Sequence, residues 1–334
     1  MTDILIYGAG AIGSFLTYLL TEPVRRDGSG GKIVETNVAL LGRESHMRAI
    51  RERGLHVDLG EKTEILRFEH CFSSLDDLKA SDFCPDVVFV CVKTHSLPAL
   101  CQELQESGLL EERLKRSLFI LLMNGMGNRE VFLEAGLHPA RLQEGITSLG
   151  VFLAGEGNIE LKGRGKTVLQ DGMDGEEKEF LAERFSEKGF EIDFSPDFRR
   201  QQYYKLLVNA AINPITALAR RQNGIILSPA LKGTVQAVVE EAVAVAAAEG
   251  LAIQEEEAVE LVFSVAEKTA VNTSSMLQDV MRGRSTEIEA ISGYIVRQAE
   301  KHGIAVPVNK ALYGMVKSIS GLQPDKDKQG RCSV

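Results

Sequence analysis

The sequence of 334 residues lacks several features that define broad classes of protein. Its five cysteines form no CxxC pair and are odd in number, which favours reduced thiols over a disulfide framework. The six histidines are scattered without the spacing of metal ligands, so we expect no metal site. No uncharged stretch reaches the length of a membrane span, and the N-terminus begins in a strand pattern rather than a signal peptide. We therefore expect a soluble, cytoplasmic protein.

The sequence also has no excess of basic residues. It carries 38 Lys and Arg against 47 Asp and Glu, which gives a net charge of −9. This balance argues against a nucleic-acid or anionic-membrane surface, although a few local cations would suffice for a small anionic ligand. The length exceeds what one hydrophobic core usually covers, so we expect two domains.

Uninterrupted apolar runs occupy the first part of the chain. They lie at 3–7, 37–41, 86–92 and 118–123, separated by segments with helical patterns, and the stretch 144–195 looks like further strands. Such runs indicate a parallel sheet that helices cover on both faces. After Pro196 helical periodicity dominates, at 232–249, 255–268 and 287–301. We therefore expect an α/β domain over 1–195, a helical domain over 196–322 and a polar, disordered tail over 323–334.

A glycine-rich loop follows the first apolar run. Gly8, Gly10 and Gly13 have the GxGxxG spacing between a strand and a helix. In that context the first glycine permits a tight turn, the second lets the backbone approach a pyrophosphate, and the third lets helix and strand pack closely. The pattern therefore predicts a dinucleotide site; the alternative is a glycine turn without a ligand.

The end of the second strand indicates which dinucleotide binds. If 37–41 is that strand, Arg43 follows it and suits a 2′-phosphate, whereas an acid there would suit a ribose hydroxyl. If 32–35 were the strand instead, Glu35 would stand where an NAD-binding acid belongs. The longer run at 37–41, followed at once by a helix start, favours NADP over NAD. The Gly-rich, charged stretch before it reads as a loop.

Polar residues also follow the third and fourth runs. Lys93 follows the third, and Asn124 opens the sequence NGMG after the fourth. Ligands of open α/β sheets bind at this carboxyl edge, so these residues fit a cofactor and substrate crevice better than two unrelated loop residues.

A polar stripe runs along a helix that is otherwise apolar. Lys205, Asn209 and Asn213 are spaced four residues apart, so they share one helix face. Such a helix is normally buried, and its polar face must then meet a cleft or polar partners. We expect Lys205 to protonate a carbonyl oxygen during reduction, rather than to snorkel to solvent. Pro214 predicts a kink or an end of the helix near Asn213.

Two later segments have the spacing of helix caps. These are SSMLQD from Ser274 and the Thr286–Glu287 pair, and spacing alone favours a capping role for both.

Taken in order, GAGAIG, VKT, NGMG, KLLVNAAINPITAL, SSMLQD, TEIEAISG and HGIAVPVN resemble the motifs of ketopantoate reductases over about residues 3–318. The resemblance implies a Rossmann-type domain followed by an all-α domain like the C-terminal domain of 6-phosphogluconate dehydrogenase. It also implies NADPH-dependent reduction of 2-dehydropantoate to (R)-pantoate, in the branch leading to coenzyme A.

The resemblance assigns roles to individual residues. Lys205 matches the general acid, and Asn124 matches a residue that lies near cofactor and substrate and assists catalysis. The cofactor contacts implied are Gly8, Ala9, Gly10, Ala11, Ile12, Gly13, Arg43, Lys93 and Asn124. The substrate contacts implied are Asn209, Asn213, Asn223, Ser275 and Glu287. Tyr203 stands where the family often has Trp, and an insertion over 23–31 lengthens the loop beside the adenosine end.

Three functional hypotheses remain. The first is a ketopantoate reductase, the second is an NADPH-linked reductase of another small 2-keto acid, and the third is a non-catalytic dinucleotide-binding sensor. The sensor would need the glycine loop but not Lys205, Ser275 and Glu287 together. The Ala- and Val-rich stretch 235–248 requires apolar cover, which makes a homodimer through the helical domain a further hypothesis.

Overall fold

The computed structural model describes residues 2–21, 25–26, 32–33 and 38–322. The chain forms two compact units, one of residues 1–123 and 128–198, the other of residues 124–127 and 199–334. The domain boundary predicted after residue 195 stays a prediction. The predicted tail lies outside the described residues, as do Glu35 and most of the predicted insertion.

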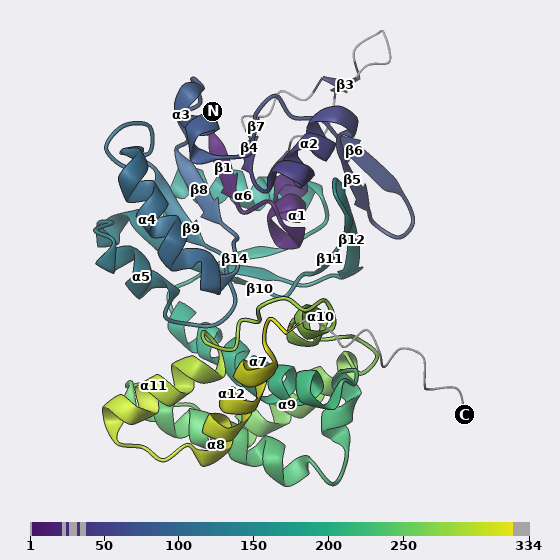
Figure 1. Ribbon diagram of the computed structural model, residues 1–334, viewed down its shortest axis with the longest axis vertical. Helices are drawn as coiled ribbons and strands as arrows, with labels where there is room; N and C mark the ends of the chain where they lie inside the picture. Colours follow the sequence, from purple (N-terminus) through teal and green to yellow (C-terminus); the bar gives the residue numbers. More distant parts are fainter. Residues whose placement is uncertain (1, 22–24, 27–31, 34–37, 323–334) are drawn as a thin grey trace. The chain divides into compact units, whose positions relative to one another are not determined.

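The first unit is built on an eight-stranded sheet (Figure 1). In spatial order its strands are β14 (Ile192–Ser195), β13 (Thr167–Gln170), β10 (Leu142–Thr147), β9 (Leu118–Leu121), β8 (Val87–Val90), β1 (Ile4–Tyr7), β4 (Val38–Leu41) and β7 (Cys71–Phe72). All neighbours are parallel except β10 and β13. The four predicted apolar runs are thus four adjacent parallel strands, as expected.

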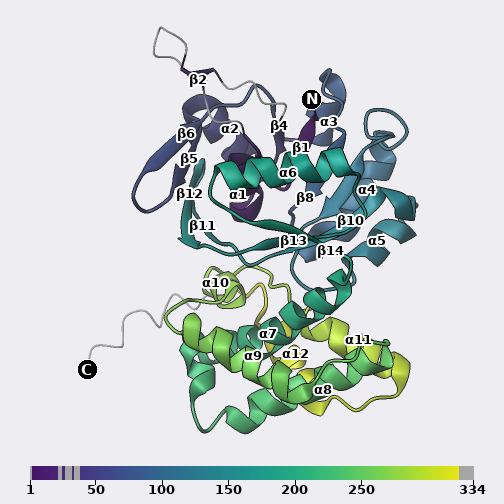
Figure 2. The ribbon, with the colours of Figure 1, turned by 180° about the vertical axis from the view of Figure 1, so that it is seen from behind.

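Helices cover both faces of this sheet. They are α1 (Ala11–Leu20), α2 (Glu44–Arg53), α3 (Leu75–Ala80), α4 (Leu97–Ser107), α5 (Asn128–Glu134) and α6 (Gly175–Glu187). Successive residues of β1 enter different cores, because Ile4 and Ile6 pack with α1 and α6 while Leu5 packs with α3, α4 and α5. Figures 1 and 2 view the unit from opposite sides, with α4 on one face and α6 on the other. The predicted α/β fold with a Rossmann-type sheet is confirmed.

The second strand of the parallel sheet is β4, in register with β1 from the pair Ile4 and Val38. The rival strand at 32–35 is wrong, because Lys32–Ile33 (β3) pairs antiparallel with Arg25–Arg26 (β2) in a separate two-stranded ribbon.

Two parts of the first unit differ from the sequence prediction. A second sheet combines β11 (Gly150–Gly155) and β12 (Asn158–Gly163) with β5 (Leu55–Asp58) and β6 (Thr63–Leu66). The prediction of strands throughout 144–195 is wrong over 175–187, where α6 forms. Asp174 and Glu177 start α6 with a reciprocal capping box, a local signal that outweighs the neighbouring glycines.

The second unit is helical. Its helices are α7 (Phe198–Ala219), α8 (Lys232–Ala248), α9 (Glu255–Lys268), α10 (Ser275–Met281), α11 (Ser292–His302) and α12 (Pro307–Ile319). The helices predicted at 232 and 255 are confirmed. The one predicted from 287 is wrong at its start, since residues up to 291 form turns and α11 begins at Ser292. Among the described residues no helix is long and apolar enough to cross a membrane.

Helix α8 is buried within a single copy of the chain. Val235, Val238 and Val239 are fully buried in a core that includes residues of α7, α9, α11 and α12. The apolar cover that motivated the homodimer hypothesis is therefore supplied by the chain itself. The homodimer stays a prediction, but α8 gives it no support.

The sequence predicts a kink or an end of the helix near Asn213. Helix α7 runs through Pro214 to Ala219, so an end at Asn213 is wrong. A proline interrupts one backbone hydrogen bond, and burial of the surrounding apolar residues offsets that loss. Leu206, Leu207 and Ala210 are almost fully buried in the core of this unit.

Candidate active site

The glycine loop between β1 and α1 has the geometry of a phosphate cradle. Gly8 has φ +102°, and a Cβ there would lie 2.7 Å from the amide nitrogen of Val92. A Cβ at Gly13 would collide with the carbonyl oxygen of Gly8. Gly10 is different, because a Cβ there would meet nothing nearer than 4.0 Å. The first and third glycines thus serve packing, while the second leaves open space beside the backbone.

Gly10 is also the N-cap of α1 and provides no side-chain capping bond. Ala11, Ile12 and Gly13 form the first turn, and no acidic residue lies in it. Ala9, within the loop, is buried. A helix N-terminus with open space beside its N-cap glycine suits an anion such as a pyrophosphate, so these residues fit a nicotinamide dinucleotide.

Cations follow the strands on either side of β1. Arg43 follows β4, is exposed, and is the N-cap of α2. Lys93 follows β8, is half-buried, and is the N-cap of a short 3₁₀ helix, η1 (Thr94–Ser96). Because β8, β1 and β4 are parallel neighbours, their carboxyl ends bring Lys93, the glycine loop and Arg43 to one edge of the sheet.

Three side chains distant in sequence meet within the second unit. Lys205 on α7 donates through Nζ to Oδ1 of Asn124 at 3.0 Å. Asn124 donates in turn through Nδ2 to Oε2 of Glu287 at 2.9 Å. The amide therefore lies between the ammonium and the carboxylate, with its acceptor toward the cation and its donor toward the anion. We call Lys205, Asn124 and Glu287 the lysine relay.

Burial changes the acidity of the lysine. Lys205 is half-buried on an apolar helix, and Glu287 is 5% exposed. Desolvation lowers the pKa of Lys205 to about 8, and the charge of Glu287 opposes part of that shift. An amine with such a pKa is mostly protonated at neutral pH and gives up its proton more readily than an ordinary lysine.

Asn124 reaches this position because the segment Asn124–Gly127 packs with the helical unit, although it follows β9 in the chain. The amide of Met126 donates to the carbonyl of Ala290 at 2.8 Å, and the Met126 side chain is 3% exposed in the helical core. Gly125 has φ +76°, and a Cβ there would collide with Ala290. This docking was not predicted, and the two glycines of NGMG are the local signal for it.

The other predicted residues lie on elements that are tied to α7. Asn209 and Asn213 continue the Lys205 face of α7, and Asn213 is 6% exposed. Ser275 is exposed in the first turn of α10. The residue before it, Ser274, caps α10 by accepting from the amide of Leu277, as spacing predicted. The Ser274 hydroxyl lies 2.6 Å from that of Thr216, which ties the start of α10 to α7.

Asn223 begins η3 (Asn223–Leu227) and has an incomplete set of hydrogen bonds. Its Nδ2 donates to Oγ1 of Thr269 at 3.0 Å, while its Oδ1 is buried with no partner in the described part of the chain. A buried acceptor left unpaired costs free energy, so a ligand that donates to it would gain affinity.

A further polar cluster, not foreseen from the sequence, surrounds Glu249. The hydroxyl groups of Tyr203 and Tyr294 and the guanidinium of Arg199 all donate to this carboxylate. Burial, followed by the charge of Glu249, raises the pKa of Tyr294. The cluster joins α7, α8 and α11 and includes the fully buried Tyr203. Among the described residues, no group of three or more His, Cys, Asp or Glu side chains could hold a metal.

Comparison with known proteins places this architecture. Residues 4–173 match the family described as "Ketopantoate reductase PanE/ApbA", and residues 197–320 match "Ketopantoate reductase PanE/ApbA C terminal". A 2-dehydropantoate 2-reductase of Archaeoglobus fulgidus is 33% identical over 321 residues, covering 95% of this chain and 98% of that protein. One from Pyrococcus horikoshii is 31% identical and covers 96% of this chain and 98% of that protein.

Solved structures agree. A PanE/ApbA family ketopantoate reductase from Ralstonia eutropha has a TM-score of 0.80 at 26% identity, over 95% of this chain and 97% of that one. D-mandelate dehydrogenase with NADH and anilino(oxo)acetate has the same TM-score, identity and coverage. The family matches extend over both units, and this chain therefore belongs to the ketopantoate reductase family.

Proposed function

We propose that this protein reduces 2-dehydropantoate to (R)-pantoate with NADPH, and that Lys205 is the general acid. The observation that carries the proposal is the lysine relay. In it the partly desolvated Lys205 ammonium donates to the Asn124 amide, and that amide donates in turn to the buried Glu287 carboxylate. The curated relatives named 2-dehydropantoate 2-reductase support the choice of substrate.

The bound cofactor would supply a hydride to the ketone carbon, and the protein must then stabilise and protonate the oxygen. Lys205 Nζ would donate to that oxygen, offset its developing negative charge and transfer a proton to give the alcohol. Asn124 would accept one hydrogen bond from the Lys205 ammonium and so keep the ammonium oriented toward the substrate oxygen. Glu287 would orient the Asn124 amide and keep Lys205 mostly protonated, because its charge raises the pKa of Lys205.

The substrate carboxylate and hydroxyl would be bound by polar residues around the relay. Ser275 in the first turn of α10 suits a carboxylate, since a helix N-terminus favours negative charge. Asn209 and Asn213 share the Lys205 face of α7, and the unpaired Oδ1 of Asn223 would accept from a substrate hydroxyl.

The choice of NADPH over NADH rests on Arg43. Strand β4 contains no acid, and the first carboxylate after it, Glu44, is paired with Arg51 at 3.0 Å. The exposed Arg43 guanidinium would bind a 2′-phosphate in a bidentate manner. Gly8–Gly13 would hold the pyrophosphate, and Lys93 and Asn124 would contact the cofactor at their strand ends.

The test is oxidation of NADPH in the presence of ketopantoate. Wild type should turn over, and Lys205→Ala should lose about 10³-fold in kcat, because a general acid and its charge are both removed. Lys310→Ala is the matched control, since Lys310 is an exposed lysine of the same unit that pairs with Glu300. Equal rates for Lys205→Ala and wild type would refute the role of Lys205.

A second candidate is reduction of another small 2-keto acid. The likeness to D-mandelate dehydrogenase, solved with the oxo acid anilino(oxo)acetate, favours testing it. A panel of keto acids compared by kcat/KM would decide, and a clear preference for a compound other than ketopantoate would select this candidate. Tight NADPH binding with no turnover of any carbonyl compound would instead favour the non-catalytic sensor.

A further inference from the structure

Glu287 lies in a part of the helical unit that has no regular secondary structure. It occupies the turns between α10 and α11, where the local hydrogen bonds run from Ala290 N to Glu287 O and from Gly293 N to Ile288 O. No helical ladder fixes its backbone, yet its carboxylate must stay within reach of Asn124. Contacts from elsewhere in the fold are needed to hold this segment.

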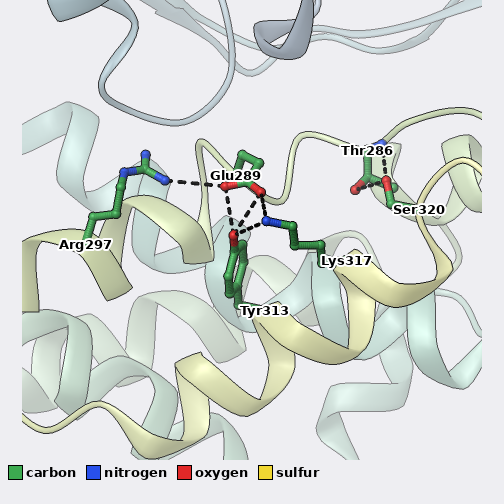
Figure 3. Close-up of polar contacts among 6 residues, drawn as sticks. All are labelled: Thr286, Glu289, Arg297, Tyr313, Lys317 and Ser320. Atoms are coloured by element: carbon green, nitrogen blue, oxygen red, sulfur yellow. Dashed lines mark hydrogen bonds and ion pairs between the residues drawn. The ribbon is translucent and has the colours of Figure 1, made fainter. Parts of the chain in front are cut away.

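The residue before Glu287 is fixed by the end of α12. The amide of Thr286 donates to Oγ of Ser320 at 2.8 Å, and the two hydroxyl oxygens are 3.1 Å apart (Figure 3). Thr286 is 4% exposed. The amide of Gly321 donates to the carbonyl of Arg284 at 3.2 Å, which adds a backbone bond between the same two segments.

The residue two positions after Glu287 is fixed by the same helix. The Tyr313 hydroxyl lies 2.8 and 2.9 Å from the carboxylate oxygens of Glu289, and Nζ of Lys317 lies 2.7 Å from Oε1 (Figure 3). Arg297 on α11 makes a longer contact of 3.5 Å. Tyr313 approaches closely because Gly293 faces it, where a Cβ would come within 3.0 Å of the ring.

We propose that Tyr313, Lys317 and Ser320, which we call the α12 clamp, are positioning residues for the lysine relay. The clamp holds the backbone amide of Thr286 before Glu287 and the side chain of Glu289 after it, so that the Glu287 carboxylate orients Asn124 and thereby Lys205. None of the three is assigned a contact with substrate or cofactor. The inference rests on the proposed function, because it concerns the same relay.

The charges of the clamp fit a positioning role better than a role in stability alone. Side chains of Glu289 and Lys317 are 46% and 58% exposed, and ion pairs this exposed contribute little to the free energy of unfolding. Partial burial raises the pKa of Glu289, but hydrogen bonds from Lys317 and Tyr313 outweigh it and leave the pKa lowered. Glu289 is therefore ionised over the pH range in which Lys205 titrates.

The experiment measures kcat for ketopantoate reduction as a function of pH in Tyr313→Phe, Ser320→Ala and the double variant. Lys310→Ala is the matched control, because it removes a different contact of α12, that of Lys310 with Glu300 of α11 at 3.1 Å, away from Glu287. We expect the double variant to lose about 10-fold in kcat, as small displacements of catalytic groups do. Its KM for NADPH should equal that of wild type.

The basic limb of the pH profile should also move to lower pH in the clamp variants. A displaced Glu287 raises the pKa of Lys205 less, so the ammonium would deprotonate earlier. In a Glu287→Gln background the clamp substitutions should add no further shift. If the double variant does not fold, the two single variants decide in the same way.

Other outcomes separate the clamp from the function. In one outcome the clamp variants match Lys310→Ala both in kcat and in the position of the basic limb while Glu287→Gln is impaired. That result would leave the reductase assignment standing but overturn the positioning role of the clamp. A fall in kcat without a shift of the limb would likewise overturn it. If Glu287→Gln and Lys205→Ala both keep wild-type turnover, the proposed function itself fails.

Discussion

The glycine loop and the lysine relay are two sites built in opposite ways. The loop is one contiguous run, Gly8–Gly13, in which the backbone and the absence of side chains form the site. The relay consists of three side chains, and its hydrogen bonds span 81 and 163 positions of the chain. The loop depends on the absence of side-chain atoms at its glycines, whereas the relay depends on the chemical identity of each of its three side chains. The two sites should therefore fail differently when mutated.

The sharpest way to break the relay is Asn124→Ala, which leaves its backbone in place but removes the amide between Lys205 and Glu287. We expect kcat to fall by about 10²- to 10³-fold, the range seen when a preorganised polar group is removed. Steady-state kinetics with NADPH and ketopantoate measure it. Asn158→Ala, in the first unit, removes an amide that donates to the nearby carbonyl of Glu156 and should leave kcat unchanged. A similar loss in both would show that the effect is not specific to the relay.

The loop should be sensitive to one added carbon. Gly8→Ala places a Cβ 2.7 Å from the Val92 backbone at φ +102°, so the loop must move. We expect NADPH to bind about 100-fold more weakly, measured by quenching or calorimetry, because a shift of about 1 Å at a phosphate site is costly. Gly60→Ala is the control, since Gly60 has φ +89° but nothing within 4 Å. Equal effects in both variants would assign the loss to backbone strain rather than to the space in the loop.

The relay, unlike the loop, should titrate. Lys205 donates a proton, so the active form is protonated, and its pKa is lowered to about 8. Below that pH kcat should be level with respect to this group, and well above it kcat should fall about tenfold per pH unit. Stopped-flow measurement of the chemical step would report it. A level profile up to pH 10 would contradict the role of Lys205, whereas NADPH affinity should not follow the same limb.

The smallest expected effect concerns the cation beside the loop. Arg43→Ala should raise the KM for NADPH about tenfold and leave that for NADH unchanged, because only NADPH offers a 2′-phosphate to a charge-assisted bond. Arg48→Ala, which changes an exposed arginine within α2, is the control. If Arg43→Ala weakens both cofactors equally, the preference for NADPH has another origin.

The contrast between the sites also explains what the sequence could predict. Strands β1, β4, β8 and β9 were predictable because a strand buried on both faces must be apolar throughout. The phosphate cradle was predictable because its glycines are contiguous. Helix α6 was missed although its capping box at Asp174 is a local signal, since neighbouring glycines suggested strands and turns.

The spatial arrangement of the relay was beyond reach from spacing alone. Lys205 stood out by its polar stripe, but Glu287 and Ser275 looked like caps, and their assigned roles came from the resemblance. Their roles, like those of Asn209, Asn213 and Asn223, stay predictions. That Asn124 packs with the helical unit depends on Ala290 and Met126, which meet only once the chain has folded.

Residues Asn124–Gly127 belong to the helical unit, and this has a consequence for hybrid enzymes. The chain passes between the two units at three junctions, after residues 123, 127 and 198. A crossover made at residue 198 alone, between two homologues, would join one parent's Gly125 and Met126 to the other parent's Ala290. Recombination libraries of such enzymes should therefore transfer residues 124–127 together with everything after 198, so that each inherited amide meets the lysine with which it evolved.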